Sequence, residues 1–392
     1  MTPPVQEALI SKHKRRLRDL PRPDAAGGAG YYDQIRDEAL AFDGRRRENY
    51  QRFQGAARGG ADVDYQPIKL DIENVSRCNF SCTMCTVSKW HKGKRADDLA
   101  LEDFKALIDE QYGLVEIKLQ GIGEPTMQGD DFFEMIRYAR AKKIWVRTTT
   151  NASLLHLKDN YKKLIDSDPN EVQISLDGAD AETFQSIRQG SVFERVVGNC
   201  KLINDYCKEI GVQRTKMWTV VQRGNVDQLE ALVDLAKEAG FTNMVFSLDM
   251  HGWADDDLMA RNRDQMVEDN IDVERLFALI ERGAALGVDV RFWNVSDKYA
   301  TARSQDLCPW PFERSYIASD LRVVPCCMIG NPDEFELESG CDDGRSFADI
   351  WSGTAYRNFR QSHVDGNIPT VCKSCYIPRS RQNPKDVNCG TA

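Results

Sequence analysis

The most informative stretch of the sequence contains three cysteines, Cys78, Cys82 and Cys85. Their spacing is C-x3-C-x2-C, and they follow the alternating apolar run from Ile68 to Val75. Three thiolates on so short a loop can bind three irons of a [4Fe-4S] cube and leave the fourth iron without a protein ligand. Such an open iron can bind another molecule. The alternatives are buried thiols or a zinc site, which requires a fourth ligand, and the next loop offers only His91.

A second group of cysteines lies in the last quarter of the chain. Twelve cysteines is a high number for 392 residues, and close spacing in a reducing compartment indicates metal binding rather than disulfides. C-x17-C, a long gap and C-x2-C supply four thiolates, a closed ligand set for one further cluster; a zinc ribbon is the alternative. The predicted ligands are Cys308, Cys326, Cys372 and Cys375. Cys327, Cys341 and Cys389 have no assigned role, although Cys327 or Cys389 can substitute for a ligand.

The composition is that of a soluble globular enzyme, with 41% hydrophobic and 29% charged residues and a net charge of −9. Basic residues are concentrated only in Lys12 to Arg18, so we expect no nucleic-acid partner. No apolar run is long enough to span a membrane, and residues 1–19 lack an apolar signal region. The sequence therefore predicts a cytoplasmic protein without a membrane partner.

Strand-like and helix-like stretches alternate from residue 67 to about residue 297. This order indicates crossover units and a parallel sheet, and six units predict an α/β fold with a partial (βα)6 barrel. The predicted strands are Ile68–Val75, Leu114–Gln120, Ile144–Thr149, Glu171–Asp177, Lys216–Val221 and Met244–Leu248, with Val288–Trp293 as an additional candidate.

Two further parts flank the predicted barrel. Residues 1–66 are expected to form a helical, partly flexible extension with a helix over Tyr31–Gln54. Residues 298–392 are expected to form a small cysteine-rich α+β domain. Within it, Tyr316–Pro325 predicts a hairpin that ends at Cys326, and a helix is predicted near Ser346–Gln361.

Glycines and polar residues follow the predicted strands, where parallel barrels carry their functional groups. After the second strand come Gly121, Gly123 and Glu124; glycines let the backbone approach a bound group, and a carboxylate suits a cation. Taken alone, each such residue is more often a turn or cap former. At the later strand ends, the substrate-side candidates are Gln222, Arg223, Asn225, Asp249 and His251.

The cysteine motif and these strand ends together resemble the signature of the radical S-adenosylmethionine (SAM) enzymes. In that family SAM chelates the open iron, and electron transfer from the cluster cleaves SAM to a 5′-deoxyadenosyl radical. Gly121 to Pro125 resembles the family's G-G-E-P segment, which receives the SAM amino group, with Ile122 in place of one glycine. The resemblance implies that the residues near SAM are Phe80, Gly121, Gly123, Glu124, Thr149, Asn151, Ser175 and Arg188, the last pairing with the SAM carboxylate.

The C-terminal cysteines resemble the twitch domain, a shortened relative of the SPASM domain that holds one auxiliary [4Fe-4S] cluster. A full SPASM domain needs further cysteines after C-x2-C, where this chain has Arg381 and Lys385. We therefore expect two [4Fe-4S] clusters, one that binds SAM and one auxiliary. Over residues 67 to about 380, the barrel and ligand order are similar to those of aminocyclitol dehydrogenases of antibiotic biosynthesis.

These features predict a radical SAM oxidoreductase that dehydrogenates a small polar substrate, such as a sugar or aminocyclitol. The auxiliary cluster would accept the electron that remains after hydrogen abstraction, and Arg223 or His251 would serve as the base. The reducing electrons would come from a flavodoxin-type or ferredoxin-type partner.

Three alternatives stay open. A maturase of ribosomally made peptides is one, although residues 1–66 lack the strand patterns of a leader-binding winged helix. The second is a sugar epimerase in which a thiol such as Cys207 returns the hydrogen. The third is a non-catalytic iron–sulfur or zinc scaffold, against which the SAM-site residues argue.

Overall fold

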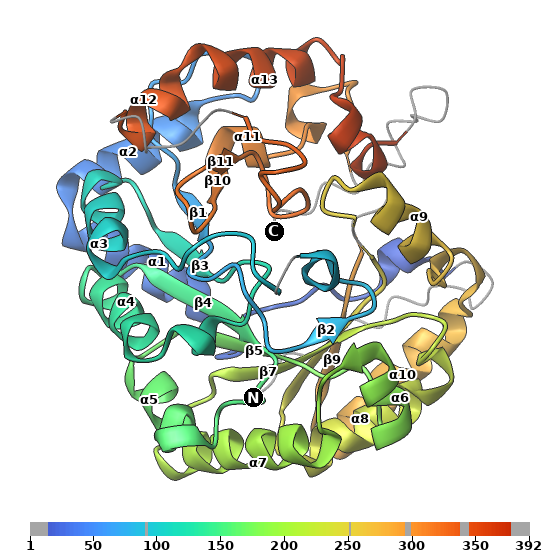
Figure 1. Cartoon of the computed structure of the whole chain (residues 1–392). Coiled ribbons are helices and arrows are strands. Elements are labelled where there is room, and N and C mark those ends of the chain that lie inside the picture. The colour runs from blue at the N-terminus through green and yellow to red at the C-terminus, as the bar shows by residue number, and fades with distance from the viewer. Residues whose placement is uncertain (1–14, 91–92, 251, 295–298, 338–344, 378–392) are drawn as a thin grey trace.

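The chain folds into a partial barrel of parallel strands with helices on its outer side (Figure 1). The computed structural model describes residues 15–90, 93–250, 252–294, 299–337 and 345–377. The strand order is β11-β10-β1-β3-β4-β5-β7-β8-β9, so the predicted six-unit partial barrel is confirmed and the additional strand forms one edge. The barrel strands are β1 (Lys69–Ile72), β3 (Glu116–Leu119), β4 (Trp145–Thr150), β5 (Glu171–Ser175), β7 (Thr215–Val220), β8 (Asn243–Ser247) and β9 (Asp289–Trp293).

Helices follow these strands and cover the outer face of the sheet. They are α3 (Leu101–Glu110), α4 (Asp130–Ala141), α5 (Asn160–Asp166), α6 (Ala181–Ile187), α7 (Phe193–Glu209), α8 (Leu229–Glu238), α9 (Asp256–Arg263) and α10 (Val273–Leu286). In β3, Ile117 and Leu119 are fully buried in the core beneath the helices, whereas Glu116 and Lys118 alternate with them on the inner face. Each fully buried apolar side chain contributes roughly 1.5–3 kcal/mol to the free energy of folding, so the contact between sheet and helices stabilises the barrel. The polar side chains of β3 face the barrel interior.

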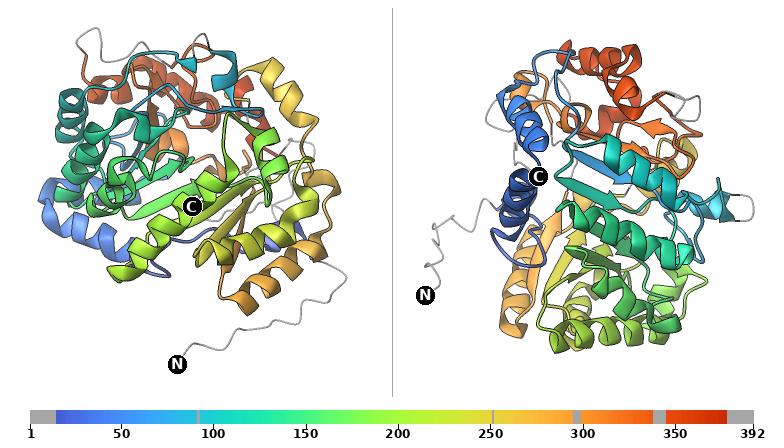
Figure 2. Two further views of the ribbon diagram at one scale, coloured as in Figure 1. Left: turned by 60° about the horizontal axis from the view of Figure 1, so that its bottom comes forward. Right: turned by 90° about the vertical axis from the view of Figure 1, so that its left-hand side faces the viewer.

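The N-terminal segment crosses the amino ends of the barrel strands. Its helices are α1 (Tyr31–Phe42) and α2 (Gly44–Gly55), because the predicted single helix is interrupted at Asp43, whose side chain accepts a hydrogen bond from the Arg45 amide. Tyr31 and Tyr32 pack edge-on against Trp145 at the start of β4. Figure 2 shows these helices on the side of the sheet opposite the loop that contains β2.

Further contacts connect this segment to β9, β5 and β3. The Phe292 amide donates to Pro21, the Ala26 amide donates to Glu171, and the Tyr32 hydroxyl donates to Glu116 at 2.9 Å. The N-terminal segment therefore closes the amino-terminal end of the barrel.

The C-terminal part continues the barrel sheet. The predicted hairpin is confirmed as β10 (Arg314–Ile317) with β11 (Val323–Val324), and β10 pairs in parallel with β1. The remaining helices are α11 (Trp310–Glu313), α12 (Phe347–Ser352) and α13 (Thr354–Val364), the last two separated at Gly353 within the helix predicted from sequence. The Trp351 indole donates to the Tyr65 carbonyl at 2.8 Å, which attaches α12 to the segment before β1.

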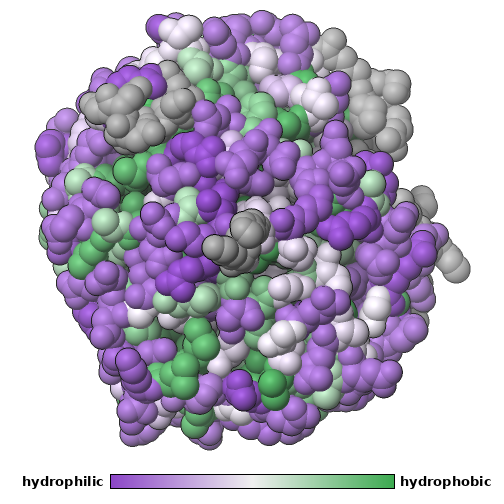
Figure 3. All heavy atoms as spheres, in the orientation of Figure 1, coloured by the Kyte–Doolittle hydropathy of each residue, from purple (hydrophilic) through white to green (hydrophobic). Residues whose placement is uncertain are grey.

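The face that contains the carboxyl ends of the strands is mainly hydrophilic, with small, scattered apolar areas (Figure 3). Among the described residues, no helix combines the length and apolar character needed to cross a lipid bilayer.

Candidate functional site

The three-cysteine loop lies at the carboxyl end of β1, as predicted. Its short strand β2 (Ser81–Cys82) pairs antiparallel with β6 (Arg188–Gln189), which places Cys82 opposite Arg188. The Phe80 amide lies 3.4 Å from the Cys78 sulfur, and the Asn151 side-chain amide lies 3.8 Å from the same atom. The Arg188 guanidinium lies 3.9 Å from the Cys82 sulfur. N–H groups directed at cysteine sulfurs stabilise thiolate ligands and tune cluster potentials.

The thiols of this loop are held in a dry environment. Burial raises the pKa of Cys78, with the nearby Glu124 carboxylate acting in the same direction, and burial raises the pKa of Cys85 to about 12. Without a bound metal these groups therefore stay protonated at neutral pH, whereas metal coordination deprotonates a thiol outright.

The donor set fits an iron–sulfur cluster. Three thiols and the N–H groups around them belong to one loop and the strand ends beside it. No three His, Cys, Asp or Glu side chains within the described ranges are arranged to hold a single metal ion. The fit therefore rests on the three sulfurs and on the positive and N–H groups that face them.

The glycines after β3 allow two loops to pack closely. A Cβ atom at Gly121 would lie 2.1 Å from the Glu73 side chain, and one at Gly123 would lie 2.4 Å from the Val75 carbonyl oxygen. The Glu124 amide also donates to the Arg77 carbonyl at 2.9 Å. The loop after β3 thus presses against the three residues that precede Cys78.

We expect Gly123→Ala to displace the cysteine loop, because the clash is with backbone and cannot be relieved by a rotamer change. Overpacking of this kind costs about 1–3 kcal/mol or more, so the urea midpoint and the iron content should both fall. Gly198→Ala is the matched control, since a Cβ there meets nothing within 4 Å and alanine favours the helix by roughly 1 kcal/mol. Equal midpoints and iron contents for both variants would contradict this packing role.

Glu124 is already fully hydrogen bonded inside the protein. One carboxylate oxygen accepts from the Thr126 and Thr150 hydroxyls, both at 2.6 Å, and the other accepts from the Asn151 amide at 2.7 Å. Burial raises the pKa of Glu124, and these hydrogen bonds oppose the rise. Glu124 therefore joins the ends of β3 and β4, and its predicted contact with the SAM amino group stays a prediction.

The other predicted SAM residues lie at neighbouring strand ends. The Asn151 side chain donates to Asn79 in the cysteine loop at 3.0 Å, and the Thr149 hydroxyl donates to Gln173. Ser175 ends β5, is 9% exposed, and its hydroxyl has no hydrogen-bond partner among the residues described. The structure brings this set together around the loop, and its role in SAM binding stays a prediction.

Arg188 is paired with a carboxylate of the protein itself. Its Nε and one terminal nitrogen both lie 2.7 Å from an oxygen of Asp177, which is fully buried, while the other terminal nitrogen faces Cys82. Burial raises the pKa of Asp177 even though Arg188 opposes the change. Arg188 thus connects the end of β5 to the cysteine loop.

A cleft of about 470 Å³ opens beside the cysteine loop. Of the substrate-side candidates, Gln222 lines this cleft, and its buried side-chain nitrogen has no partner among the described residues. Arg223 is exposed and does not line the cleft, and His251 lies outside the described residues. The full lining is Thr83, Met84, Ser186, Ile187, Gln222, Gly224, Met250, Arg261, Asn262, Asp264 and Gln265.

Sequence reasoning missed the contribution of α9 and the turn after it to this cleft. Arg261 and Asp264 place opposite charges on the lining, and the Asn262 side chain donates to the Met84 carbonyl at 3.0 Å. These residues follow the last predicted strand end and lack any motif, so only their placement in space identifies them.

The four C-terminal cysteines lie near one another, and their role as cluster ligands stays a prediction. Burial raises the pKa of Cys326, and the nearby thiols of Cys327, Cys372, Cys308 and Cys375 act in the same direction. The Cys308 amide also donates to the Tyr376 hydroxyl at 2.8 Å. Cys341 and Cys389 lie outside the described residues.

Cys327 has different neighbours from Cys326. The charged groups that act on its thiol are Asp71, Lys118, Arg314 and Arg147, which belong to the barrel interior. Cys327 therefore lies toward the barrel, and the choice of Cys326 as the cluster ligand stays a prediction.

Comparisons with known proteins agree with this geometry. The model of the radical SAM superfamily matches residues 74–236, and the model of an iron–sulfur cluster-binding domain, SPASM, matches residues 308–376. The chain is 35% identical over 180 residues to mycofactocin maturase MftC of Mycolicibacterium smegmatis, covering 45% of this chain and 43% of that protein. It is 34% identical over 188 residues to GTP 3′,8-cyclase of Aliarcobacter butzleri, covering 46% and 54%. The chain thus spans about half the length of the curated relatives it matches.

Solved structures support the fold. Streptococcus suis SuiB bound to the precursor peptide SuiA superimposes with a TM-score of 0.58 at 16% identity, covering 80% of this chain and 70% of SuiB. Native anSMEcpe with bound AdoMet superimposes with a TM-score of 0.52 at 19% identity, covering 79% of this chain and 88% of anSMEcpe. The resemblance to aminocyclitol dehydrogenases stays a prediction.

The chain therefore contains a radical SAM domain followed by a SPASM domain. A radical SAM domain binds SAM and a [4Fe-4S] cluster, and a SPASM domain binds auxiliary iron–sulfur clusters. The two kinds of cofactor expected from the sequence are thereby confirmed.

Proposed function

We propose that the protein is a radical SAM oxidoreductase that removes two hydrogens from a small polar substrate. The observation that carries this proposal is the second group of neighbouring cysteines. Cys308, Cys326, Cys372 and Cys375 supply four thiols, which is enough to ligate every iron of an auxiliary cluster. A fully ligated cluster suits electron transfer rather than substrate binding.

When bound, the cofactors supply a 5′-deoxyadenosyl radical that takes a hydrogen atom and an auxiliary cluster that accepts the remaining electron. The protein supplies the proton acceptor and the substrate contacts. Asp264 lines the cleft with no hydrogen-bond partner among the described residues, so its carboxylate can take the proton of a carbinol. The free side-chain nitrogen of Gln222 can donate to a substrate oxygen. A secondary carbinol that loses a hydrogen atom, a proton and an electron becomes a ketone.

Of the two bases predicted from sequence, His251 stays a proposal, whereas the chemistry of arginine argues against Arg223 in that role. An arginine guanidinium does not lose its proton in proteins and has no acceptor lone pair. Arg223 thus suits a contact with a substrate anion better than the role of a base.

The test is an anaerobic assay of reconstituted protein with SAM and a chemical reductant, followed by a flavodoxin-type or ferredoxin-type donor. With the true substrate among candidate sugars and aminocyclitols, we expect one 5′-deoxyadenosine for each product molecule that is lighter by two hydrogens. Deoxyadenosine formed without substrate oxidation would instead identify the epimerase. Absence of SAM cleavage by the reduced protein would support the scaffold.

A second candidate function is the maturation of a peptide. The 35% identity to a segment of mycofactocin maturase favours it. The barrel interior offers a positive charge that can bind a peptide carboxylate. Lys118 has no ion pair among the described residues, whereas Arg147 and Arg314 both pair with Glu116. Incubation with short peptides, including ones with a free carboxylate, followed by mass spectrometry, distinguishes the two functions.

We expect Asp264→Asn to reduce kcat/KM for oxidation by about 10²–10⁴, because proton transfer by a positioned group contributes that much. The iron content should not change. Asp257→Asn on α9 is the control, since that carboxylate is exposed and does not line the cleft. Equal rates for both variants would rule out Asp264 as the proton acceptor.

A further inference from the structure

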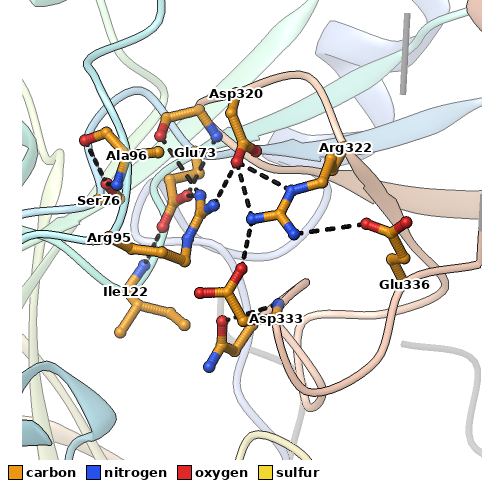
Figure 4. Close-up of polar contacts among 11 residues, drawn as sticks. Glu73, Ser76, Arg95, Ala96, Ile122, Asp320, Arg322, Asp333 and Glu336 are labelled. Atoms are coloured by element: carbon orange, nitrogen blue, oxygen red, sulfur yellow. Dashed lines mark hydrogen bonds and ion pairs between the residues drawn. The ribbon is translucent and has the colours of Figure 1, made fainter. Parts of the chain in front are cut away.

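A buried carboxylate joins the barrel to the C-terminal part of the chain. Glu73 follows β1 and is completely buried. One of its oxygens accepts from the Ile122 amide at 3.2 Å. The other accepts from the Arg95 guanidinium at 2.7 Å and from the Ser319 amide at 3.1 Å. Glu73 thus contacts the loop after β3, the segment after the cysteine loop and the segment after β10 (Figure 4).

Arg95 lies at the closing end of the cysteine loop. The Arg95 amide donates to the Ser76 carbonyl, and the Ser76 hydroxyl and the Ala96 backbone exchange two hydrogen bonds of 2.8 and 2.9 Å. Next to them, Arg77 forms a two-pronged ion pair with Asp98. The two ends of the segment that carries the three cysteines are therefore fastened together at Arg95.

From Arg95 the ion pairs continue into the C-terminal part. The Arg95 side chain is 2% exposed and lies 2.5 Å from an oxygen of Asp320, in the turn between β10 and β11. The same oxygen accepts from Arg322 at 2.9 Å, and Arg322 also pairs with Asp333. Figure 4 shows these side chains as one continuous chain of charges. Cys326 and Cys327 follow β11 after Pro325, so the chain of charges includes the hairpin that precedes them.

We infer that the ion pairs of Glu73, Arg95 and Asp320 position the SAM-cluster loop relative to the auxiliary-cluster hairpin. These three are positioning residues, because they contact neither set of cysteines. Buried, paired charges impose a single geometry, since displacement of one partner leaves the other charge buried and uncompensated. The inference concerns the relation between the two cysteine sets and does not depend on the substrate.

The first test uses alkylation of cysteines in the full-length protein after iron is removed with a chelator. Mass spectrometry follows the labelling rates of individual thiols in wild type, Glu73→Gln and Asp320→Asn. Loss of either charge should accelerate labelling of Cys78, Cys82 and Cys85 at least tenfold. Cys200 and Cys207 on α7 are buried in the core and serve as internal controls. Faster labelling of all five thiols, or unchanged labelling of the loop, would overturn the inference.

The second test uses the reconstituted, reduced protein with both clusters. Magnetic interaction between two reduced clusters broadens their EPR signals and depends steeply on distance. Asp320→Asn should keep the iron content of wild type and change this broadening. Glu102→Gln removes an exposed ion pair with Lys105 and should leave the spectrum unchanged. A lower unfolding temperature with a wild-type spectrum would show a purely structural role. If Glu73→Gln fails to fold, the partly exposed Asp320 still decides the question.

Discussion

Replacing Cys78, Cys82 and Cys85 together with alanine should lower the iron content from about eight to about four atoms per chain, because only the auxiliary [4Fe-4S] cluster is retained. SAM cleavage should fall below detection, since the only open iron is removed. The three cysteines share one loop, and donors from Phe80 and Asn151 face the Cys78 sulfur. Iron and sulfide analysis with EPR of the anaerobically reconstituted proteins measures this directly.

The reciprocal variant has alanine at Cys308, Cys326, Cys372 and Cys375. It should also keep about four irons, but with the EPR response to SAM intact. A result of about four irons in wild type and none in the first variant would show that the protein binds no auxiliary cluster. That result would exclude the dehydrogenation proposed above and favour a redox-neutral reaction.

The second large effect is expected for Arg188→Met. This change leaves the fully buried Asp177 without its cation, and breaking a buried pair from one side costs about 3–5 kcal/mol. The pKa of Asp177 is already raised by burial, and loss of Arg188 raises it further. A carboxylic acid whose pKa is higher in the folded than in the unfolded state makes the folded protein less stable as pH rises. The deficit relative to wild type should therefore be small near pH 4, grow as pH rises toward the new pKa of Asp177, and level off above it.

Urea unfolding at several pH values measures this deficit. Arg282→Met is the control, because its ion pair with Asp234 is exposed and its removal should leave the unfolding midpoint nearly unchanged. Loss of the guanidinium beside Cys82 should also lower the reduction potential of the SAM-binding cluster. A deficit that does not depend on pH would show that Asp177 stays ionised at no cost.

The barrel and the two kinds of cofactor could be predicted from the sequence because each has a local signal. The strand and helix periods are repeated in every unit, and thiols at short spacing have few uses besides metal binding. The break at Asp43 was missed because both halves of Tyr31–Gln54 have the same charged, solvated pattern. The second start is marked by the hydrogen bond that the Arg45 amide donates to the Asp43 side chain.

The functions of single polar residues were harder to predict, because they depend on partners far away in sequence. Glu73 and Ser319 are 246 positions apart, yet the Ser319 amide donates to the Glu73 carboxylate. The predicted approach of the Gly121 backbone to SAM stays a prediction, and the structure adds a second reason for glycine there, because a Cβ atom would clash with the Glu73 side chain. The cleft residue Asp264 has no motif at all. Local spacing identifies ligands of a metal, but long-range packing decides which other residues hold them in place.

The cover that α1 and the preceding residues form across the amino ends of the strands limits how molecules enter. Among the described residues, this cover lies at the amino ends of the strands, whereas the cysteine loop and the cleft lie at the opposite end of the barrel. We expect SAM and the substrate to enter from this end, so the molecule that binds deeper in the barrel must bind first and dissociate last. Steady-state kinetics should therefore follow a compulsory order of binding, and a dead-end analogue of the later molecule should trap the earlier one inside.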